Sequence, residues 1–267
     1  MITRHDVSPL LYTVEAHQYT AVVVVQSHLE EVLIGYDKID QLLQPSLIAE
    51  VQLEPTFDVC TDGMGCLIRP SWILTAAHVA EELPRNHCIT IRETSHAMKK
   101  VFSHPEYKDS SDIADIQHNI ALIQLEEGVS VIAPLPLYSD RNERYQITTL
   151  VGSGDYGNGL IGPDQADGKL RKATNRIESV SETHLILHFD APPNGTDLEG
   201  VPGPGGSGGP ALLKVGKEWA IAGIHSGQDS KKLGEGRYGV SEYYTRVSSY
   251  RDWIESTIRE NISICKH

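Results

Sequence analysis

A single serine, Ser207, lies inside the glycine-rich stretch PGGSGGPALL (204–213). Glycine weakens the interior of a helix or strand, so this run predicts a loop. Two interpretations are open: an ordinary surface loop, or a backbone whose amide N–H groups converge beside a hydroxyl. The second arrangement would suit nucleophilic catalysis, because converging amides stabilise the oxyanion that forms next to the attacking oxygen.

Two other segments contain residues suited to such chemistry. His78 follows an apolar segment in WILTAAHVA (72–80), and Asn119 begins NIALIQLE (119–126). Together with GGSGGP, these segments resemble the TAAH, DIALL and GDSGGP motifs of the trypsin-like serine proteases, in the same order along the chain. YYTRVSSYRDWI (243–254) resembles the last strand and helix of that family, and LVGSGDYGNG (150–159) resembles the first strand of its second barrel. The resemblance covers roughly residues 60–260.

The resemblance implies a role for each of these residues. Ser207 would be the nucleophile, His78 the general base, and the N–H groups of Gly205 and Ser207 the oxyanion hole. The implied function is that of a serine endopeptidase that cleaves protein or peptide substrates through an acyl-enzyme. No metal and no cofactor is expected.

Asn119 is the main departure from the family, which has an aspartate at this position. An asparagine cannot stabilise an imidazolium by charge, and its NH₂ group can select the wrong tautomer of His78; in trypsin this exchange lowers turnover about 10⁴-fold. Three explanations are open: an engineered exchange, a naturally weak or inactive protease, or a different acid, either Asp112 or Asp115. The alternative function is therefore a pseudoprotease that binds proteins, although the presence of both Ser207 and His78 argues against it.

A second departure is Gly206, which replaces the aspartate of GDSGGP. In the family that aspartate pairs with the amine freed by proteolytic activation, so we expect no zymogen cleavage; packing, a partner or substrate must then order the loop. Gly63, Val79 and Gly203 stand at positions where secreted members form disulfides. The chain therefore resembles disulfide-free intracellular members of bacterial type, and a further alternative is an effector protease activated by a protein partner in bacterial defence or signalling.

Substrate specificity should depend on three positions in the expected pocket. By alignment with the family, Val201 is at the pocket base, and Glu242 is at a wall position where glycine is usual. His225, in GIHSG (223–227), resembles the histidine with which glutamate-specific members bind the substrate carboxylate. We expect a slight preference for basic residues; alternatively, Glu242 pairs with a cation such as Arg246 and His225 is only a wall residue.

The elements that must position these residues are mostly strands. Short apolar segments separated by Gly, Pro, Asn and Asp predict an all-β fold, which the resemblance specifies as two six-stranded antiparallel barrels with a C-terminal helix. Residues 1–267 would form a single protease domain, with the first barrel over about 20–135, the second over about 144–249 and the helix over about 249–261. The predicted strands are 20–26, 46–54, 65–77, 87–93, 119–126, 145–154, 183–190, 218–227 and 243–249, and residues 133–143 are predicted to link the two halves.

The composition excludes several classes of function. A formal charge of −13 disfavours binding to nucleic acid, and no run approaches the roughly 18 apolar residues of a membrane helix. The charged N-terminal residues do not resemble a signal peptide, so we expect a cytoplasmic protein. Cys60, Cys66, Cys88 and Cys265 match no zinc pattern and should be free thiols, with a Cys60–Cys66 disulfide as the alternative.

Overall fold

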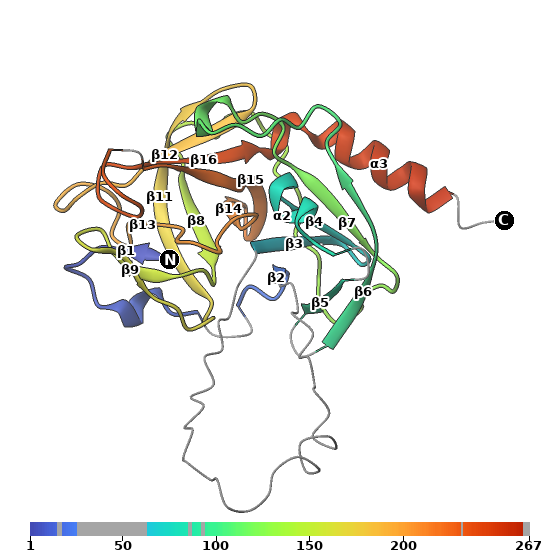
Figure 1. The fold of residues 1–267 in the computed structure, drawn as a ribbon, viewed down its shortest axis with the longest axis horizontal. Helices are drawn as coiled ribbons and strands as arrows, with labels where there is room; N and C mark the ends of the chain where they lie inside the picture. The colour runs from blue at the N-terminus through green and yellow to red at the C-terminus, as the bar shows by residue number, and fades with distance from the viewer. Residues whose placement is uncertain (15–17, 26–62, 85–86, 92–93, 231, 264–267) are drawn as a thin grey trace, which may run out of the picture.

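A computed structural model describes residues 1–14, 18–25, 63–84, 87–91, 94–230 and 232–263. These residues form two six-stranded antiparallel barrels side by side, followed by a C-terminal helix (Figure 1). The fold class predicted from the sequence is confirmed. The predicted strand 46–54 lies outside the described residues.

The first barrel has the strand order β2–β3–β4–β7–β6–β5, with β2 lying next to β5. Its central strands are mostly apolar, and every residue of β4 and β7 is buried, as expected where both faces of a strand are covered. The strand bounds are β2 (Val22–Val25), β3 (Gly63–Arg69), β4 (Trp72–Thr75), β5 (Cys88–Ile91), β6 (Thr94–Ser103) and β7 (Ala121–Leu125).

The second barrel is closed, in the order β11–β12–β16–β15–β14–β8. Its interior contains Leu150, Leu187, Leu213 and Tyr244, each at most 1% exposed. The strand bounds are β8 (Ile147–Gly152), β11 (Arg171–Val180), β12 (His184–His188), β14 (Pro210–Val215), β15 (Glu218–Asp229) and β16 (Ser241–Arg246).

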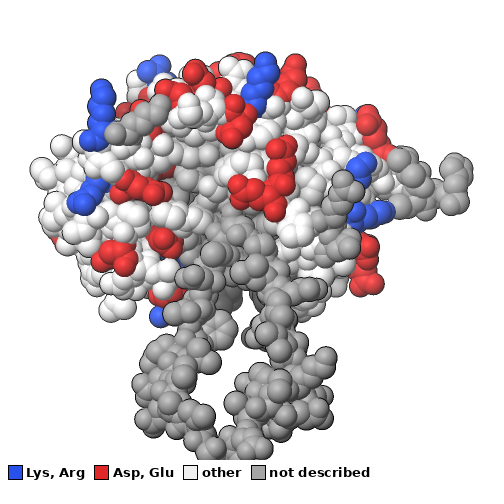
Figure 2. Space-filling model, in the orientation of Figure 1, with Lys and Arg blue, Asp and Glu red and all other residues white. Residues whose placement is uncertain are grey.

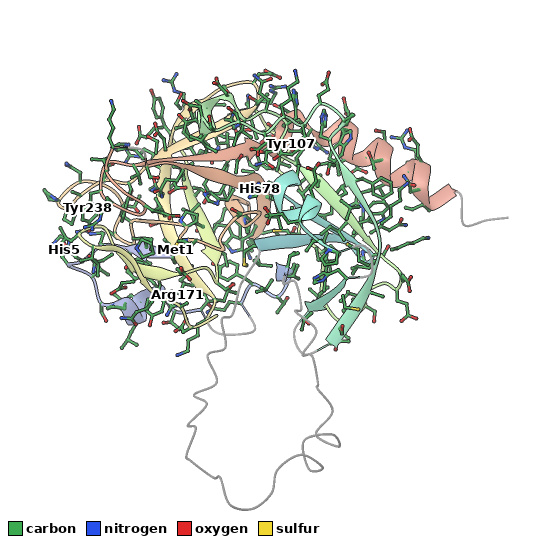
Figure 3. All side chains as sticks on the ribbon, in the orientation of Figure 1. Met1, His5, His78, Tyr107, Arg171 and Tyr238 are labelled. Carbon is green, nitrogen blue, oxygen red and sulfur yellow. The ribbon has the colours of Figure 1, made fainter. Side chains whose placement is uncertain are left out.

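A small additional sheet places the N-terminal residues on the second barrel. Strand β1 (Ile2–Thr3) pairs in parallel with β9 (Tyr156–Asn158) and antiparallel with β13 (Gly200–Val201), and β9 also pairs with β10 (Gly162–Gln165). Figures 1 and 3 show β1 and Met1 on the side of the molecule away from α3. The first three residues therefore lie directly beside the segment that leads to Ser207.

The helices and connections join the two barrels. Helix α2 (Ala77–Glu81) follows β4, and α3 (Arg251–Ser263) follows a 3₁₀ turn; Ile254 and Ile258 of α3 pack into the core of the first barrel. In the predicted linker 133–143, Leu135 N–H donates to Leu67 of the first barrel, and Tyr138 N–H donates to Ile221 of the second. Further 3₁₀ turns span Pro9–Tyr12, Ile113–Asp115 and Val247–Ser249.

The cysteines can be followed in part. Cys66, fully buried in β3, and Cys88 are free thiols. Burial raises the pKa of the Cys66 thiol far above its usual range, which makes it unreactive. Cys60 and Cys265 lie outside the described residues. Among the helices of the described chain, none has the length and apolar character needed to span a bilayer.

Candidate active site

His78 and Asn119 are brought together by two paired strands of the first barrel. His78 lies in α2, which starts two residues after β4 ends, and Asn119 lies two residues before β7 begins. In the antiparallel pairing of β4 with β7, Thr75 is opposite Ala121. The end of β4 therefore lies beside the start of β7, so that residues 41 apart in the sequence meet. In Figure 3, His78 lies between the two halves of the molecule.

The Asn119 side chain is fully buried and contacts three groups. Its Oδ1 accepts a hydrogen bond from the backbone N–H of His78 at 3.1 Å. Its Nδ2 donates to Ser226 Oγ at 2.8 Å and lies 2.9 Å from His78 Nδ1, while Oδ1 is 3.2 Å from the same nitrogen. The Asn119 backbone carbonyl accepts a hydrogen bond from Thr245 Oγ1, at 2.8 Å. Ser226 and Thr245 belong to the second barrel, so Asn119 is held from both halves of the molecule.

These contacts determine which way the Asn119 amide faces. The His78 N–H requires an acceptor, so Oδ1 must lie on that side, and Nδ2 is then left facing His78 Nδ1. An NH₂ group can only donate, so through this contact Nδ1 accepts and the ring proton lies on Nε2; in the other tautomer Nδ1–H donates to Oδ1, which is 3.2 Å away. A general base acting on Ser207 would need the opposite tautomer, with Nε2 unprotonated.

Burial also affects the charge of His78. Desolvation is the largest cause and lowers the pKa of its imidazole, and the hydrogen bond with Asn119, the next largest, raises it. Smaller contributions come from His225, which lowers the pKa, and from Glu82 and Asp109, which raise it. The ring is therefore neutral at pH 7. An aspartate at position 119 would act in the opposite direction, because a carboxylate stabilises the imidazolium.

The alternative acids suggested by the sequence do not take the place of Asn119. Asp115 is exposed, and Asp112 accepts a hydrogen bond from Ala114 N–H. It is Asn119 that lies against His78.

Ser207 lies between β13 and β14 of the second barrel and is held against the first barrel. Its carbonyl accepts a hydrogen bond from Met64 N–H at 2.7 Å. A Cβ placed on Gly63 would lie 2.6 Å from the Val79 side chain and 3.0 Å from the Ser207 carbonyl oxygen. Gly63 therefore lies between Val79 and the Ser207 carbonyl, where there is no room for a side chain. Because it is so small, the segment that contains His78 and the segment that contains Ser207 can approach each other.

The amides proposed for the oxyanion hole have no internal partner. Within the described chain, neither the Gly205 N–H nor the Ser207 N–H donates a hydrogen bond, and both residues are partly exposed. The preceding carbonyl, Pro204 O, accepts from Asp155 N–H at 2.8 Å. In a trans peptide the C=O and the next N–H point in opposite directions, so this bond directs the Gly205 N–H away from Asp155. Gly205 has φ +77°, a conformation that favours glycine.

The surroundings of Gly206 leave no room for a side chain. A Cβ at this position would lie 2.8 Å from Gly203 O and 2.9 Å from Pro202 Cβ. The neighbouring Gly154 is equally close to the loop, since its Cβ would lie 2.3 Å from Pro204 O. The α-amino group of Met1 donates to the carbonyls of Gly154 and Asp155, at 3.1 and 2.5 Å. The loop before Ser207 is therefore held by the 154–155 segment and β1.

Two of the predicted specificity residues, His225 and Glu242, form a buried polar group. His225 Nε2 lies 2.7 Å from Glu242 Oε2, and Gln228 Nε2 donates to the other oxygen of the same carboxylate. Glu242 is fully buried, whereas His225 Nδ1 is a buried nitrogen with no hydrogen-bond partner among the described residues. The suggested pairing of Glu242 with Arg246 is wrong, because the guanidinium of Arg246 binds another carboxylate.

Arg246 makes a bidentate ion pair with the buried Glu143, at 3.0 and 2.7 Å. That pair secures the start of the second barrel to its last strand, and it leaves His225 as the partner of Glu242. Val201 is fully buried in β13, where it faces Ile2 across the sheet. The Val201 side chain therefore packs beneath the loop that contains Ser207 and does not reach the surface.

Sequence reasoning missed three residues at this site. Ser226 and Thr245, which hold Asn119, lie inside the segments GIHSG and YYTRV that carry the family resemblance. Asp155 acts through its backbone N–H, so no residue type at that position could have indicated its role. Its neighbour Gly154 gave the only available signal, a glycine next to a strand end.

Comparisons with known proteins agree with this fold and geometry. The family model described as Trypsin matches residues 47–254. The chain is also 30% identical over 220 residues to ovochymase from Halocynthia roretzi, an alignment that covers 72% of this chain and 13% of the relative. The chain thus corresponds to a small part of that longer protein. It belongs to the trypsin family of serine proteases, hydrolases with the chymotrypsin fold.

Proposed function

We propose that this chain is a serine endopeptidase in which Ser207 attacks the substrate carbonyl and His78 exchanges the proton. The observation that carries the proposal is the pair of free N–H groups, Gly205 and Ser207, at a loop whose orientation is fixed by the Asp155–Pro204 hydrogen bond. Such preorganised donors stabilise the oxyanion of the tetrahedral intermediate, and removing one typically costs about 10²–10³ in turnover.

The chemical step requires a minor state of the imidazole. Ser207 Oγ forms a bond to the substrate carbonyl carbon while its proton passes to His78 Nε2, and the same proton then leaves with the amine. In the tautomer in which Asn119 Nδ2 donates to Nδ1, Nε2 already carries a proton. Turnover therefore occurs only in the fraction of molecules in which the Asn119 amide and the His78 ring have rearranged. The chain is consequently a slow protease.

A second function, that of a protein-binding pseudoprotease, is favoured by one observation. The same 2.9 Å contact between Asn119 Nδ2 and His78 Nδ1 would hold the base in its unproductive form permanently if the amide never turned. Peptide segments would then bind in the active-site region without being cleaved.

A fluorophosphonate probe distinguishes the two functions, because it reacts only with an activated serine. We expect slow labelling of the chain at Ser207, identified by mass spectrometry of the adduct, and fast labelling of Asn119→Asp. Ser207→Ala is the matched control and should not react. Absence of labelling in both the chain and Asn119→Asp, with the fold intact by circular dichroism, would establish the pseudoprotease.

For substrate specificity we propose a preference for Lys or Arg before the cleaved bond. Glu242 is buried with one histidine partner, and nearby Glu235 has a raised pKa through burial and the charges of Glu242 and Asp155, which indicates local negative potential. On the face of the molecule that Figure 2 shows, acidic side chains also outnumber basic ones. On the Asn119→Asp background, Glu242→Gln should reduce cleavage after Lys and Arg; faster cleavage after Glu in the parent would instead assign His225 to an acidic substrate.

We also propose that the enzyme works without zymogen cleavage and in a reducing compartment such as the cytoplasm. Support comes from the glycine packing at Gly206 and from the free thiols of Cys66 and Cys88. Titration of the unreduced, denatured protein should then give a thiol for each of the four cysteines. A smaller number would contradict a disulfide-free protein. An activating protein partner would be detected as faster fluorophosphonate labelling of the unmodified chain.

A further inference from the structure

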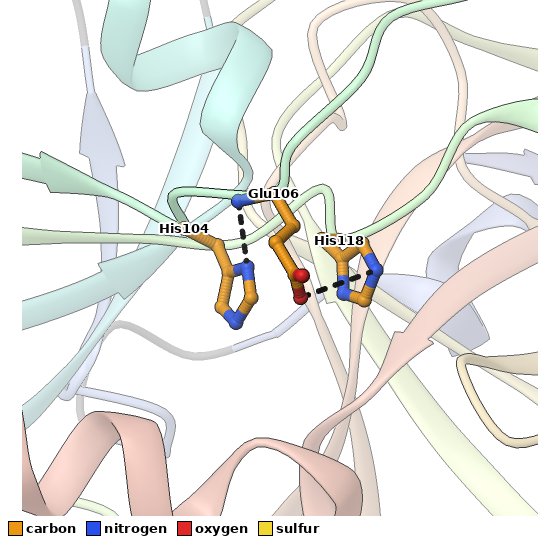
Figure 4. A group of neighbouring side chains, drawn as sticks. All are labelled: His104, Glu106 and His118. Carbon is orange, nitrogen blue, oxygen red and sulfur yellow. Dashed lines mark hydrogen bonds and ion pairs between the residues drawn. The ribbon is translucent and has the colours of Figure 1, made fainter.

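Two histidines and a glutamate gather on the first barrel, next to Asn119 in the chain but not among the residues assigned to the active site. His104 follows directly after β6, Glu106 is two residues further on, and His118 ends the loop that leads to Asn119 (Figure 4). The hydrogen bond from His104 N–H to Ile120 O keeps the two segments side by side. One nitrogen or oxygen from each of the three side chains lies within 4.8 Å of the others.

The orientation of each ring leaves a nitrogen for a ligand. His118 Nδ1 is 3.1 Å from the Tyr250 hydroxyl, and its Nε2 is 4.0 Å from Glu106 Oε2. The ring of His104 stacks on that of His118, with centroids 4.8 Å apart and planes 10° from parallel. Tyr250 and Trp253 pack against His104, at centroid distances of 5.3 and 5.1 Å. Because a metal lies in the plane of each imidazole that binds it, one of the two parallel rings must turn for both to bind the same ion.

One weak contact must give way for a ligand to bind His104. Its Nδ1 accepts a hydrogen bond from Glu106 N–H at 3.3 Å, close to the upper limit for such bonds. A metal at Nδ1 would take the place of that bond, and a metal at Nε2 would leave the proton on Nδ1, which also ends it. Glu106 is exposed, so water can satisfy its amide afterwards.

We propose that His104, Glu106 and His118 bind a divalent transition-metal ion of the zinc type. Two imidazoles and one carboxylate are ligands that Zn²⁺ accepts, with water in the fourth position, whereas Mg²⁺ and Ca²⁺ prefer oxygen ligands throughout. Zn–N distances of about 2.0–2.1 Å place neighbouring ligand atoms about 3.3 Å apart in a tetrahedron. The three side chains must therefore close by at most about 1.5 Å relative to that tetrahedral spacing.

Glu106 is free to move for this closure. The Glu106 side chain is 71% exposed, and its carboxylate lies 4.0 Å from His118 Nε2, so it can swing toward a metal without leaving a buried position. The His118 side chain is held by the Tyr250 hydroxyl, and a polar partner on the second ring nitrogen is the arrangement that orients histidines in metal sites. The flexible carboxylate would thus complete the site once the stacked histidine rings have turned to direct one nitrogen each at the ion.

Zn²⁺ binding to the full chain tests the proposal by isothermal titration calorimetry, followed by Co²⁺ absorption in the visible region. We expect one Zn²⁺ per chain at this site and a melting temperature raised by about 5–10 °C at a metal concentration about a hundredfold above Kd. His104→Gln and Glu106→Gln should each weaken binding about tenfold or more. His188→Gln, which changes a histidine on β12, is the matched control and should bind as the parent does.

Two results would overturn the proposal. Equal Zn²⁺ affinity in the parent, His104→Gln and Glu106→Gln would assign the metal to other histidines. Binding of Mg²⁺ as strong as that of Zn²⁺ would exclude an imidazole site. Glu106→Gln changes only an exposed side chain, so its result does not depend on whether the histidine variants fold.

Discussion

Asn119 in the first barrel and Gly206 in the second both replace an aspartate that is typical of the trypsin family, yet their surroundings differ. Around Asn119, every contact suits a carboxylate: the His78 N–H and ring face it, and the Ser226 hydroxyl could equally donate to it. Around Gly206, Gly203 O and Pro202 Cβ lie 2.8 and 2.9 Å from where a Cβ would be. The surroundings of position 119 could therefore accommodate an aspartate, whereas those of position 206 leave no room for one.

The comparison separates two requirements of the catalytic site. The orientation of the oxyanion amides can be fixed by any packing that holds the Pro204 carbonyl, here the Asp155 N–H and the adjacent β1. The tautomer and charge of His78 depend on the group at 119 itself, because a carboxylate can only accept from Nδ1–H, whereas the amide of Asn119 can also donate to Nδ1. An aspartate introduced at position 119 should therefore raise the activity, whereas an aspartate introduced at position 206 should lower it.

The largest expected effect is that of Asn119→Asp. A carboxylate accepts from Nδ1–H and stabilises the imidazolium, so kcat/KM should rise about 10³–10⁴-fold, equivalent to about 4–5.5 kcal/mol of barrier. Peptide hydrolysis by the two proteins measures this ratio, with Ser207→Ala on the Asn119→Asp background as the inactive control. A gain below about tenfold, or 1.4 kcal/mol, would mean that the amide of Asn119 does not limit the base.

Gly206→Asp should have the opposite sign. A side chain at 206 must displace Gly203 or Pro202 and so disturb the neighbouring Gly205 amide, for which we expect a loss of about 10²–10³ in kcat on the Asn119→Asp background. Gly152→Ala is the matched control, because no described atom lies within 4 Å of its Cβ position. An increase in kcat for Gly206→Asp would show that the loop still accommodates the family residue.

Ile2→Ala tests whether β1 supports the serine loop. Ile2 is fully buried against Val201, and its Cδ1 lies 3.2 Å from the Cβ position of Gly203. Truncation to alanine should lower the free energy of unfolding by about 2–4 kcal/mol, measured in urea, and should also lower kcat. The conservative Ile2→Val should cost about 0.5–1.5 kcal/mol. A loss of stability with kcat unchanged would show that β1 does not orient the serine loop.

The smallest effect is a shift in the pH dependence. Burial and His225 lower the pKa of His78, so the acid limb of kcat/KM should lie below the ordinary pH for an imidazole. As pH falls through that pKa the ring gains a proton and activity is lost. A carboxylate at position 119 favours the protonated ring, so the limb of Asn119→Asp should move to higher pH. A shift in the other direction would mean that the introduced carboxyl group is itself protonated.

Much of the fold followed from sequence patterns. The segment 119–126 correctly predicted β7, whose two faces are both covered, whereas the single strand predicted over 65–77 is in fact two strands, β3 and β4, joined by a turn at residues 70–71. Long strands such as β6 and β11 were missed, since few of their residues are buried and many of their side chains are polar. Strand β1 was also missed, because two residues carry no periodicity and are extended only through their neighbours in the sheet.

The sequence by itself determined the residue types available for catalysis: Ser207 among glycines, His78 after a buried strand, and an asparagine where the family has an acid. Only the tertiary structure decided how Asn119 faces His78, because that depends on a backbone N–H and on Ser226 from the other barrel. The same holds for Glu242, whose partner is His225 instead of Arg246. Side-chain identity limits which hydrogen bonds are possible, whereas the choice among them is made by groups distant in the chain that folding brings within about 3 Å.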